Sequence, residues 1–89
     1  MDERHVVYVL RSEREPAHYY VGLTSVVRSR LADHNAGGSA HTAKYGPWRL
    51  SVSIEFQTQD QAATFERYLE SGSGRAFAKR HFERRTSES

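Results

Sequence analysis

The stretch of residues 6–22 constrains the fold of this chain more than any other. It opens with the apolar run VVYVL, passes through a charged loop that contains Pro16, and continues as YYVG. Two short runs rich in β-branched and aromatic residues, separated by such a loop, predict two antiparallel strands. Tyr8 and Tyr20 then lie in neighbouring strands about 5 Å apart, so the two phenols can share one small patch of sheet.

A third strand is predicted over residues 48–56. Trp48, Leu50, Val52, Ile54 and Phe56 alternate there with polar residues, and alternation of period two over this length is the strongest strand signal in the chain. The polar linker before it, residues 39–46, is expected to be a loop.

Three helices are predicted in the rest of the chain. The first runs over residues 26–36, with Thr24 or Ser25 as its cap and a glycine of the pair 37–38 at its end. The second opens in the capping-box sequence TQDQ at 58–61, and the third covers 75–85. The sequence SGSG at 71–74 is expected to break the second helix; it would offer free backbone N–H groups to an anion, although a plain turn also explains it.

Polar side chains lie on the apolar stripes of the first two predicted helices. Helical spacing from Val27 and Leu31 places Arg30 and His34 beside them, so both are expected to flank apolar residues instead of facing open water. An i, i+4 pair faces one way and can address one ligand. Glu66 falls on the stripe of the second helix, where an unpaired carboxylate is costly, so we expect it to be paired, metal-bound or open to a cleft.

Tyr8, Tyr20, Arg30, His34 and Glu66 form a set that suits phosphodiester hydrolysis. Arginine binds phosphate oxygens through its planar fork, and one carboxylate with waters and substrate phosphate is a normal Mg²⁺ environment. Two-metal hydrolysis usually needs several acids, so one ion is favoured. The general base stays open among the two phenols, whose ordinary pKa is about 10, and His34, which titrates nearer neutrality. The alternatives are a surface turn at Arg30 and His34, and a structural salt bridge between Glu66 and Arg30.

Composition places the chain in a broad class. With 89 residues the chain is expected to form one domain. The lack of cysteine fits a reducing compartment, and the expected location is the cytoplasm, in association with the nucleoid. No secretory signal and no run of about eighteen apolar residues is found, so no membrane partner is expected. The net charge is only +2, yet beyond residue 66 six basic residues face three acidic ones, which permits phosphate binding, although a solvated helix face also explains the run.

Taken in order, these residues resemble the GIY-YIG nuclease family. The sequence VVY at 6–8 stands where the first family motif would be, and YVG at 20–22 where the second would be. Arg30, His34 and Glu66 match its catalytic arginine, its histidine-or-tyrosine position and its metal-binding glutamate. The stretch YGPWRL at 45–50 is similar to small stand-alone bacterial members, and the resemblance covers about residues 5–82.

This resemblance implies an α/β (α+β) domain, a three-stranded antiparallel sheet flanked by about three helices. The sequence itself predicts a disordered tail over residues 86–89. It implies DNA cleavage with one Mg²⁺ or Mn²⁺ ion held by Glu66, with Tyr20 as base or proton relay and Arg30 as transition-state stabiliser. The chain departs from the family pattern in three places. A valine replaces the first-motif glycine, and Glu70 stands where many relatives carry lysine. Several relatives have an asparagine late in the domain, but the only asparagine here is Asn35, so Ser71 or Ser73 would take the place of that late asparagine.

Single-stranded or structured DNA is the expected substrate, with a protein partner or a homodimer supplying specificity. The residues expected to bind nucleic acid are Lys44, Ser71, Ser73, Arg75 and Lys79, with His41 and Tyr45 as further candidates. Bases can stack on Tyr45, Trp48 or Phe77, although core packing also explains the last two. The alternatives to an enzyme are an inactive nucleic-acid-binding module and a protein-interaction domain.

Overall fold

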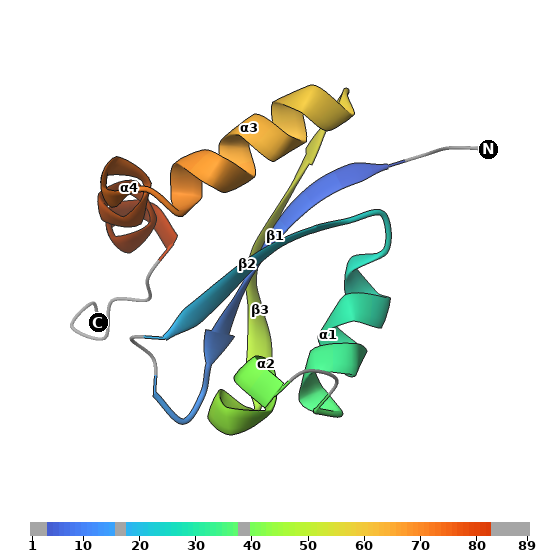
Figure 1. The fold of residues 1–89 in the computed structure, drawn as a ribbon, viewed down its shortest axis with the longest axis vertical. Coiled ribbons are helices and arrows are strands. Elements are labelled where there is room, and N and C mark those ends of the chain that lie inside the picture. Colours follow the sequence, from blue (N-terminus) through green and yellow to red (C-terminus); the bar gives the residue numbers. More distant parts are fainter. Residues whose placement is uncertain (1–3, 16–17, 38–39, 83–89) are drawn as a thin grey trace, which may run out of the picture.

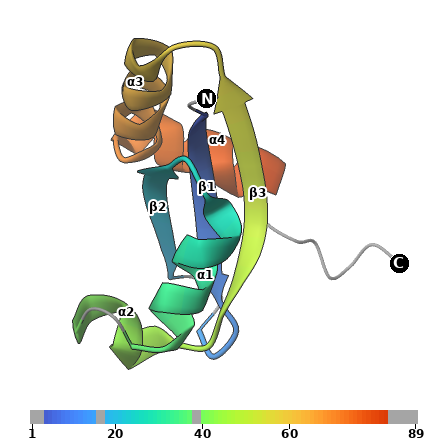
Figure 2. The same cartoon turned by 90° about the vertical axis from the view of Figure 1, so that its right-hand side faces the viewer.

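The structure of the chain is a computed structural model that describes residues 4–15, 18–37 and 40–82. Three strands form one antiparallel sheet in the order β2-β1-β3, and Figure 2 shows β1 between its two neighbours. The elements in chain order are β1 (His5–Ser12), β2 (Tyr19–Thr24), α1 (Val27–Asn35), α2 (Ala40–Tyr45), β3 (Trp48–Phe56), α3 (Gln59–Leu69) and α4 (Gly72–Phe82) (Figure 1). The predicted α+β fold with its three-stranded antiparallel sheet is confirmed, and the described residues form four helices where about three were predicted. The predicted tail 86–89 and the end of the last predicted helix, 83–85, lie outside the described residues.

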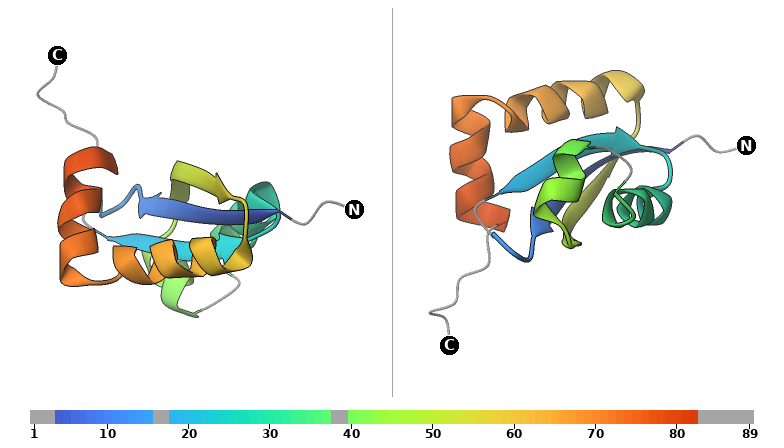
Figure 3. Two further views of the ribbon diagram at one scale, coloured as in Figure 1. Left: turned by 90° about the horizontal axis from the view of Figure 1, so that it is seen from above. Right: turned by 60° about the horizontal axis from the view of Figure 1, so that its bottom comes forward.

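The side chains of β1 alternate between the two faces of the sheet, and each face has its own apolar cluster. Val7 and Val9 pack with α3 and α4, and we call this side the α3/α4 face. Tyr8 and Leu10 pack with Trp48 and with the half-buried residues of α1, and we call this side the α1 face. Figure 3 shows the two pairs of helices on opposite sides of the sheet. The helices of the described part of the chain include none long and apolar enough to cross a membrane.

The third strand has its predicted bounds, but its alternation is interrupted. Val52 lies opposite Val9, whereas Leu50 lies opposite Leu10, so Ser51 is an extra residue and forms a β-bulge. Unbroken alternation would place every apolar residue of β3 on one face. The bulge instead sends Trp48 into the α1-face cluster and Val52 into the α3/α4-face cluster. The single strand therefore contributes to both cores.

The linker 39–46, predicted to be a loop, contains the helix α2, so that prediction is wrong. The sequence AHTAKY has no residue that breaks a helix, and glycines bound it on both sides. Gly37 ends α1 with φ of 80°, which confirms the left-handed glycine expected there. At the other end of α2, Ser12 Oγ donates a hydrogen bond of 2.6 Å to the carbonyl of Tyr45. The helix is thereby attached to the end of β1.

The predicted caps are confirmed in one helix and wrong in another. Thr58 caps α3, because its hydroxyl accepts the Gln61 N–H at 3.1 Å. The N-cap of α1 is Val26, which makes no side-chain cap bond, while Thr24 Oγ1 accepts the Val26 N–H at 3.1 Å. Thr24 therefore shapes the turn before the helix instead of capping it.

The predicted break after the second helix is confirmed, because α3 ends at Leu69 and α4 begins at Gly72. The predicted start of the last helix at residue 75 is wrong, since most of the SGSG sequence belongs to α4. Ser71 Oγ accepts the Gly74 N–H at 3.1 Å and donates to the Tyr68 carbonyl at 2.6 Å. The two helices meet closely, since a Cβ at Gly74 would lie 1.6 Å from the Tyr68 carbonyl oxygen. Two of the N–H groups expected to be free for an anion, those of Ser71 and Gly74, are already bonded within the protein.

Candidate functional site

Tyr8, Tyr20 and His34 come together on the α1 face of the sheet. Tyr8 is 1% exposed, and its hydroxyl lies 3.2 Å from Nε2 of His34, within hydrogen-bonding distance. The rings of Tyr20 and His34 are 4.6 Å apart between centroids, and those of Tyr8 and Tyr20 are 6.2 Å apart. The predicted convergence of two strand phenols with an imidazole of the first helix is therefore present in the structure.

Gly22 makes room for this arrangement. It lies opposite Tyr8 on β2, and a Cβ at position 22 would lie 2.4 Å from both Cζ and the hydroxyl oxygen of Tyr8. The phenol of Tyr8 therefore crosses directly over the glycine to reach His34. This gives a physical reason for a glycine two residues after Tyr20.

Burial sets the protonation of the two hydrogen-bonded groups. It raises the pKa of Tyr8 to about 12, with a further increase from Tyr20 that outweighs the opposite effect of the Arg30 charge. Burial also lowers the pKa of His34, and the positive charge of Arg30 adds to this effect. At neutral pH the pair is thus a neutral phenol and a neutral imidazole, and the imidazole is the group able to accept a proton.

Arg30 lies beside this cluster but faces solvent. Its side chain is 51% exposed, and its guanidinium lies 3.9 Å from the carboxylate of Asp33. The expectation that Arg30 would flank apolar residues away from water is wrong, because no residue of α1 is fully buried and the helix touches the sheet through few apolar side chains. His34, in contrast, is half-buried as predicted. The guanidinium therefore remains accessible to an anion that approaches the cluster.

Glu66 is half-buried on α3, and its charge acts on Tyr8 by raising the pKa of the phenol. Burial raises the pKa of Glu66 itself, and the nearby charge of Glu70 adds to this, against a smaller opposite effect of Arg67. Within the described part of the chain the carboxylate makes no hydrogen bond or ion pair, so the alternative of a salt bridge to Arg30 is not observed.

The donor set fits a hydrated divalent ion better than a closed metal cage. No group of three or more His, Cys, Asp or Glu side chains capable of holding a metal is found among residues 4–15, 18–37 and 40–82. A single carboxylate that is half-buried and without a partner suits Mg²⁺, which usually keeps several waters and takes one or two carboxylates together with substrate phosphate. The residues present therefore fit one ion at Glu66.

The residues predicted to bind nucleic acid are divided between the two faces. Lys44 and Tyr45 lie on the α1 face, with the Lys44 ammonium 5.5 Å from the centroid of the Tyr45 ring. His41 lies in α2, but its side chain is outside the described residues. The other four, Ser71, Ser73, Arg75 and Lys79, are exposed on or before α4, on the opposite side of the sheet from α1 (Figure 3). The structure thus does not bring them to the Tyr8 cluster.

Asn35 has a structural role that the sequence did not reveal. Its side-chain oxygen accepts the Trp48 N–H at 2.6 Å, and its side-chain nitrogen donates to the Trp48 carbonyl at 3.1 Å. The two bonds join the end of α1 to the start of β3. An asparagine at a helix end is a weak signal, and nothing in the sequence names Trp48 as its partner.

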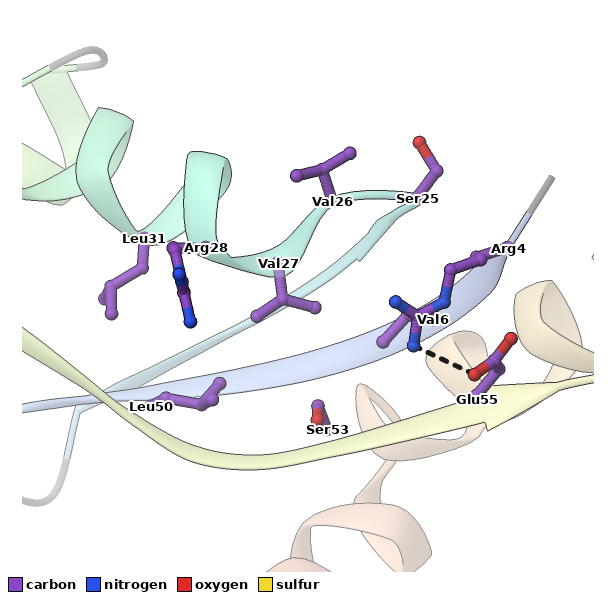
Figure 4. A pocket seen from close by; sticks show the side chains of 10 residues that line it. All are labelled: Arg4, Val6, Ser25, Val26, Val27, Arg28, Leu31, Leu50, Ser53 and Glu55. Carbon is purple, nitrogen blue, oxygen red and sulfur yellow. Dashed lines mark hydrogen bonds and ion pairs between the residues drawn. The ribbon is translucent and has the colours of Figure 1, made fainter. Parts of the chain in front are cut away.

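A groove of about 890 Å³ lies between α1 and β3 (Figure 4). Its lining includes Val27 and Leu31 from α1 and Leu50 from β3, and at one end Arg4 donates to Glu55 at 2.9 Å. None of the predicted site residues lines this groove. The candidate site is therefore the cluster on the β2 side of α1, not the groove.

Comparison with known proteins supports the family resemblance. A model of the GIY-YIG catalytic domain matches residues 4–85. A UPF0213 protein from Streptococcus pneumoniae is 36% identical over 70 residues, which cover 78% of this chain and 69% of that protein. The solution structure of a UPF0213 protein from Bacillus halodurans superposes with a TM-score of 0.52 at 28% identity, covering 85% of this chain and 80% of that one.

Two longer proteins also match. Both are named structure-specific endonuclease subunit SLX1 or its homologue. The protein from Giardia intestinalis is 37% identical to this chain over 62 residues, and the protein from Scheffersomyces stipitis is 40% identical over 67 residues. The matches cover 65% and 67% of this chain but only 17% and 20% of those relatives. The chain thus spans about a fifth of their length.

Proposed function

Since the chain belongs to the GIY-YIG family, we propose that it is a divalent-metal-dependent endonuclease that hydrolyses phosphodiester bonds in single-stranded or structured DNA. The observation that carries the proposal is the convergence of Tyr8, Tyr20 and His34 on the α1 face, with the exposed guanidinium of Arg30 one helical turn before His34. The carboxylate of Glu66 comes from α3, and its charge still raises the pKa of Tyr8. The longer SLX1 relatives are named structure-specific endonuclease subunits, which supports structured DNA as the substrate.

Arg30 is the proposed anchor for the scissile phosphate. Its half-exposed guanidinium can form two parallel hydrogen bonds to phosphate oxygens, and Asp33, at 3.9 Å, is a weak competitor for it. The same contacts strengthen as negative charge grows on the phosphate during attack by water, so they stabilise the transition state more than the ground state.

Tyr20 and His34 are the proposed route for the proton of the attacking water. Tyr20 is half-buried and accessible, whereas Tyr8 is sealed from solvent, so Tyr20 is the phenol that a water molecule can reach. Its ring contacts His34, whose lowered pKa keeps the imidazole ready to accept a proton at neutral pH. Tyr8 acts as a positioning residue, because its hydroxyl holds Nε2 of His34.

Glu66 is the proposed holder of the divalent ion that GIY-YIG nucleases generally use. When bound, an ion at this position would neutralise charge on the substrate phosphate. The unpaired state of the carboxylate supports this role, since a half-buried carboxylate without a partner lowers the stability of the fold unless a cation compensates for it.

A cleavage assay with mapped ends tests the proposal. Labelled single-stranded, duplex and branched DNA are incubated with the wild type, with Glu66→Ala and with Glu70→Ala, each with and without Mg²⁺ or Mn²⁺. We expect cutting by the wild type and Glu70→Ala only when a metal is present, and none by Glu66→Ala. If wild type and Glu66→Ala are equally inert but bind DNA in a salt-dependent manner, the chain is a nucleic-acid-binding module. The lack of any salt-dependent binding would favour a protein-interaction domain.

A further inference from the structure

His18 and Tyr45 form a stacked pair of rings on the surface of the protein. Their centroids are 4.1 Å apart and their planes differ by 18°. His18 comes from the loop before β2, and Tyr45 is the last residue of α2, so the two meet only because the chain folds. Lys44 adds a positive charge 5.5 Å from the centroid of the Tyr45 ring. A flat, half-exposed aromatic surface with a cation beside it is thereby created.

The stack continues the row of residues that forms the candidate site. Alternate residues of β2 face the same side, and Gly22 and Tyr20 both face α1. His18 directly precedes β2, and its carbonyl accepts the Ser12 N–H at 3.1 Å, so the pairing with β1 extends to it. Tyr45 packs against the same α1-face cluster that contains Tyr8. The stack and the candidate site thus lie side by side on one face of the molecule.

The backbone segments that carry both rings are held in place by hydrogen bonds within the protein. The His18 N–H donates to the carbonyl of Glu15 at 2.8 Å, and the His18 carbonyl accepts from the Ser12 N–H at 3.1 Å. The imidazole Nδ1 lies 3.3 Å from the Glu15 carboxylate, while 44% of the His18 side chain stays exposed. Ser12 also bonds the carbonyl of Tyr45, so a single residue of β1 ties down both members of the stack. Little conformational entropy remains to be lost when a flat ligand binds.

We propose that the His18–Tyr45 stack is a subsite for an unpaired nucleobase, from a nucleotide near the phosphate that is cut. Aromatic platforms beside cations are how proteins hold single-stranded nucleic acid without reading its sequence, because every base has a π-face. Lys44 lies where it can contact the backbone of that nucleotide. The inference rests on the proposed nuclease function and narrows its substrate to DNA that is unpaired at the cleavage point, because a base within a duplex is already stacked on its neighbours.

A binding experiment that does not depend on cleavage tests this subsite. A fluorescently labelled single-stranded oligonucleotide is compared with the same backbone made of abasic residues, for the wild type, His18→Ala and His18→Phe. His81→Ala is the matched control, because His81 also lies against an aromatic ring, that of Phe77 at 4.5 Å, but on α4. We expect His18→Ala to weaken binding of the base-containing strand roughly tenfold and to leave the abasic strand unchanged, while His18→Phe and His81→Ala bind like the wild type.

Three results would overturn the subsite: His18→Ala binding both strands like the wild type, His18→Ala losing both equally, or His18→Phe failing to restore the preference for bases. Folding of each variant is checked by circular dichroism, and the exposed position of His18 makes its replacement mild. The same samples are tested for cleavage with Mg²⁺ or Mn²⁺. If the wild type binds the base-containing strand more tightly but cuts no DNA, the nuclease function is refuted and the subsite is supported. If the wild type cuts DNA but binds both strands equally, the subsite is refuted and the nuclease function is supported.

Discussion

Replacing Gly22 by alanine is the substitution that most directly separates the chemistry of the site from the stability of the fold. The new methyl group would lie 2.4 Å from the end of the Tyr8 ring, where ordinary contact requires at least 3.4 Å. The ring must therefore move by about 1 Å. Tyr8 is 1% exposed and has no free space to enter, so we expect the clash to lower the free energy of unfolding by about 1–3 kcal/mol.

Gly22→Ala should reduce the rate of cleavage by a larger factor than its modest loss of stability would by itself suggest. A shift of about 1 Å breaks the bond of 3.2 Å between Tyr8 and His34, and a misplacement of this size in a catalytic group costs about 100-fold in rate. Urea denaturation measures the first effect, and cleavage of a labelled branched substrate at saturating Mg²⁺ measures the second, under conditions where the variant is still folded.

Gly72→Ala is the matched control, because no atom lies within 4 Å of the Cβ it would add. It should cut at the wild-type rate and be equally or slightly more stable, since alanine reduces the freedom of the unfolded chain. If Gly22→Ala folds and cuts DNA as fast as the wild type, the position of the Tyr8 phenol does not matter for the reaction and the reasoning is refuted.

Three further predictions follow from the same geometry. Glu66→Gln should leave the free energy of unfolding unchanged or slightly higher, because it removes a carboxylate without a partner, while metal-dependent cleavage falls at least about 100-fold. Because the pKa of His34 is lowered in the folded protein, the unfolded chain binds a proton at this residue more readily than the folded chain does. The protein should therefore lose stability as the pH falls below about 6.5, the ordinary pKa of histidine. Thermal melts should show this loss for the wild type but not for His34→Phe. Asn35→Ala should lower the free energy of unfolding by about 2 kcal/mol in urea denaturation, because it removes two hydrogen bonds to the Trp48 backbone that contribute about 1 kcal/mol each.

Most of the fold could be predicted because its signals are local. The hairpin, the bounds of β3 and the Thr58 cap each depend on residues close together in the sequence. The bulge at Ser51 could not be predicted, because it arises from the pairing of β3 with β1 and leaves the alternation in the sequence intact. Helix α2 was missed for a related reason: six polar and small residues have little helical signal of their own, and tertiary contacts decide.

The site was predicted where residue type and helical spacing sufficed, as for the meeting of Tyr8 with His34. Spacing failed for Arg30, because the depth at which a helix sits in the core depends on the number of its apolar residues, not on their period alone. The stack of His18 on Tyr45 had no sequence signal, since it depends on a contact between segments far apart in the chain. Pairwise contacts of this kind are the part of a site that a single sequence does not contain.

The strand and the helix that carry the candidate site differ in how deeply they are buried. Seven of the eight residues of β1, which carries Tyr8, are buried, whereas α1, which carries Arg30 and His34, has none. Amide hydrogens of α1 should accordingly exchange with solvent well before those of β1, through excursions in which the helix lifts from the sheet and the rest of the domain stays intact. These openings would separate Arg30 and His34 from Tyr8 and Tyr20. The fraction of molecules with an assembled site therefore depends on how stably α1 packs on the sheet.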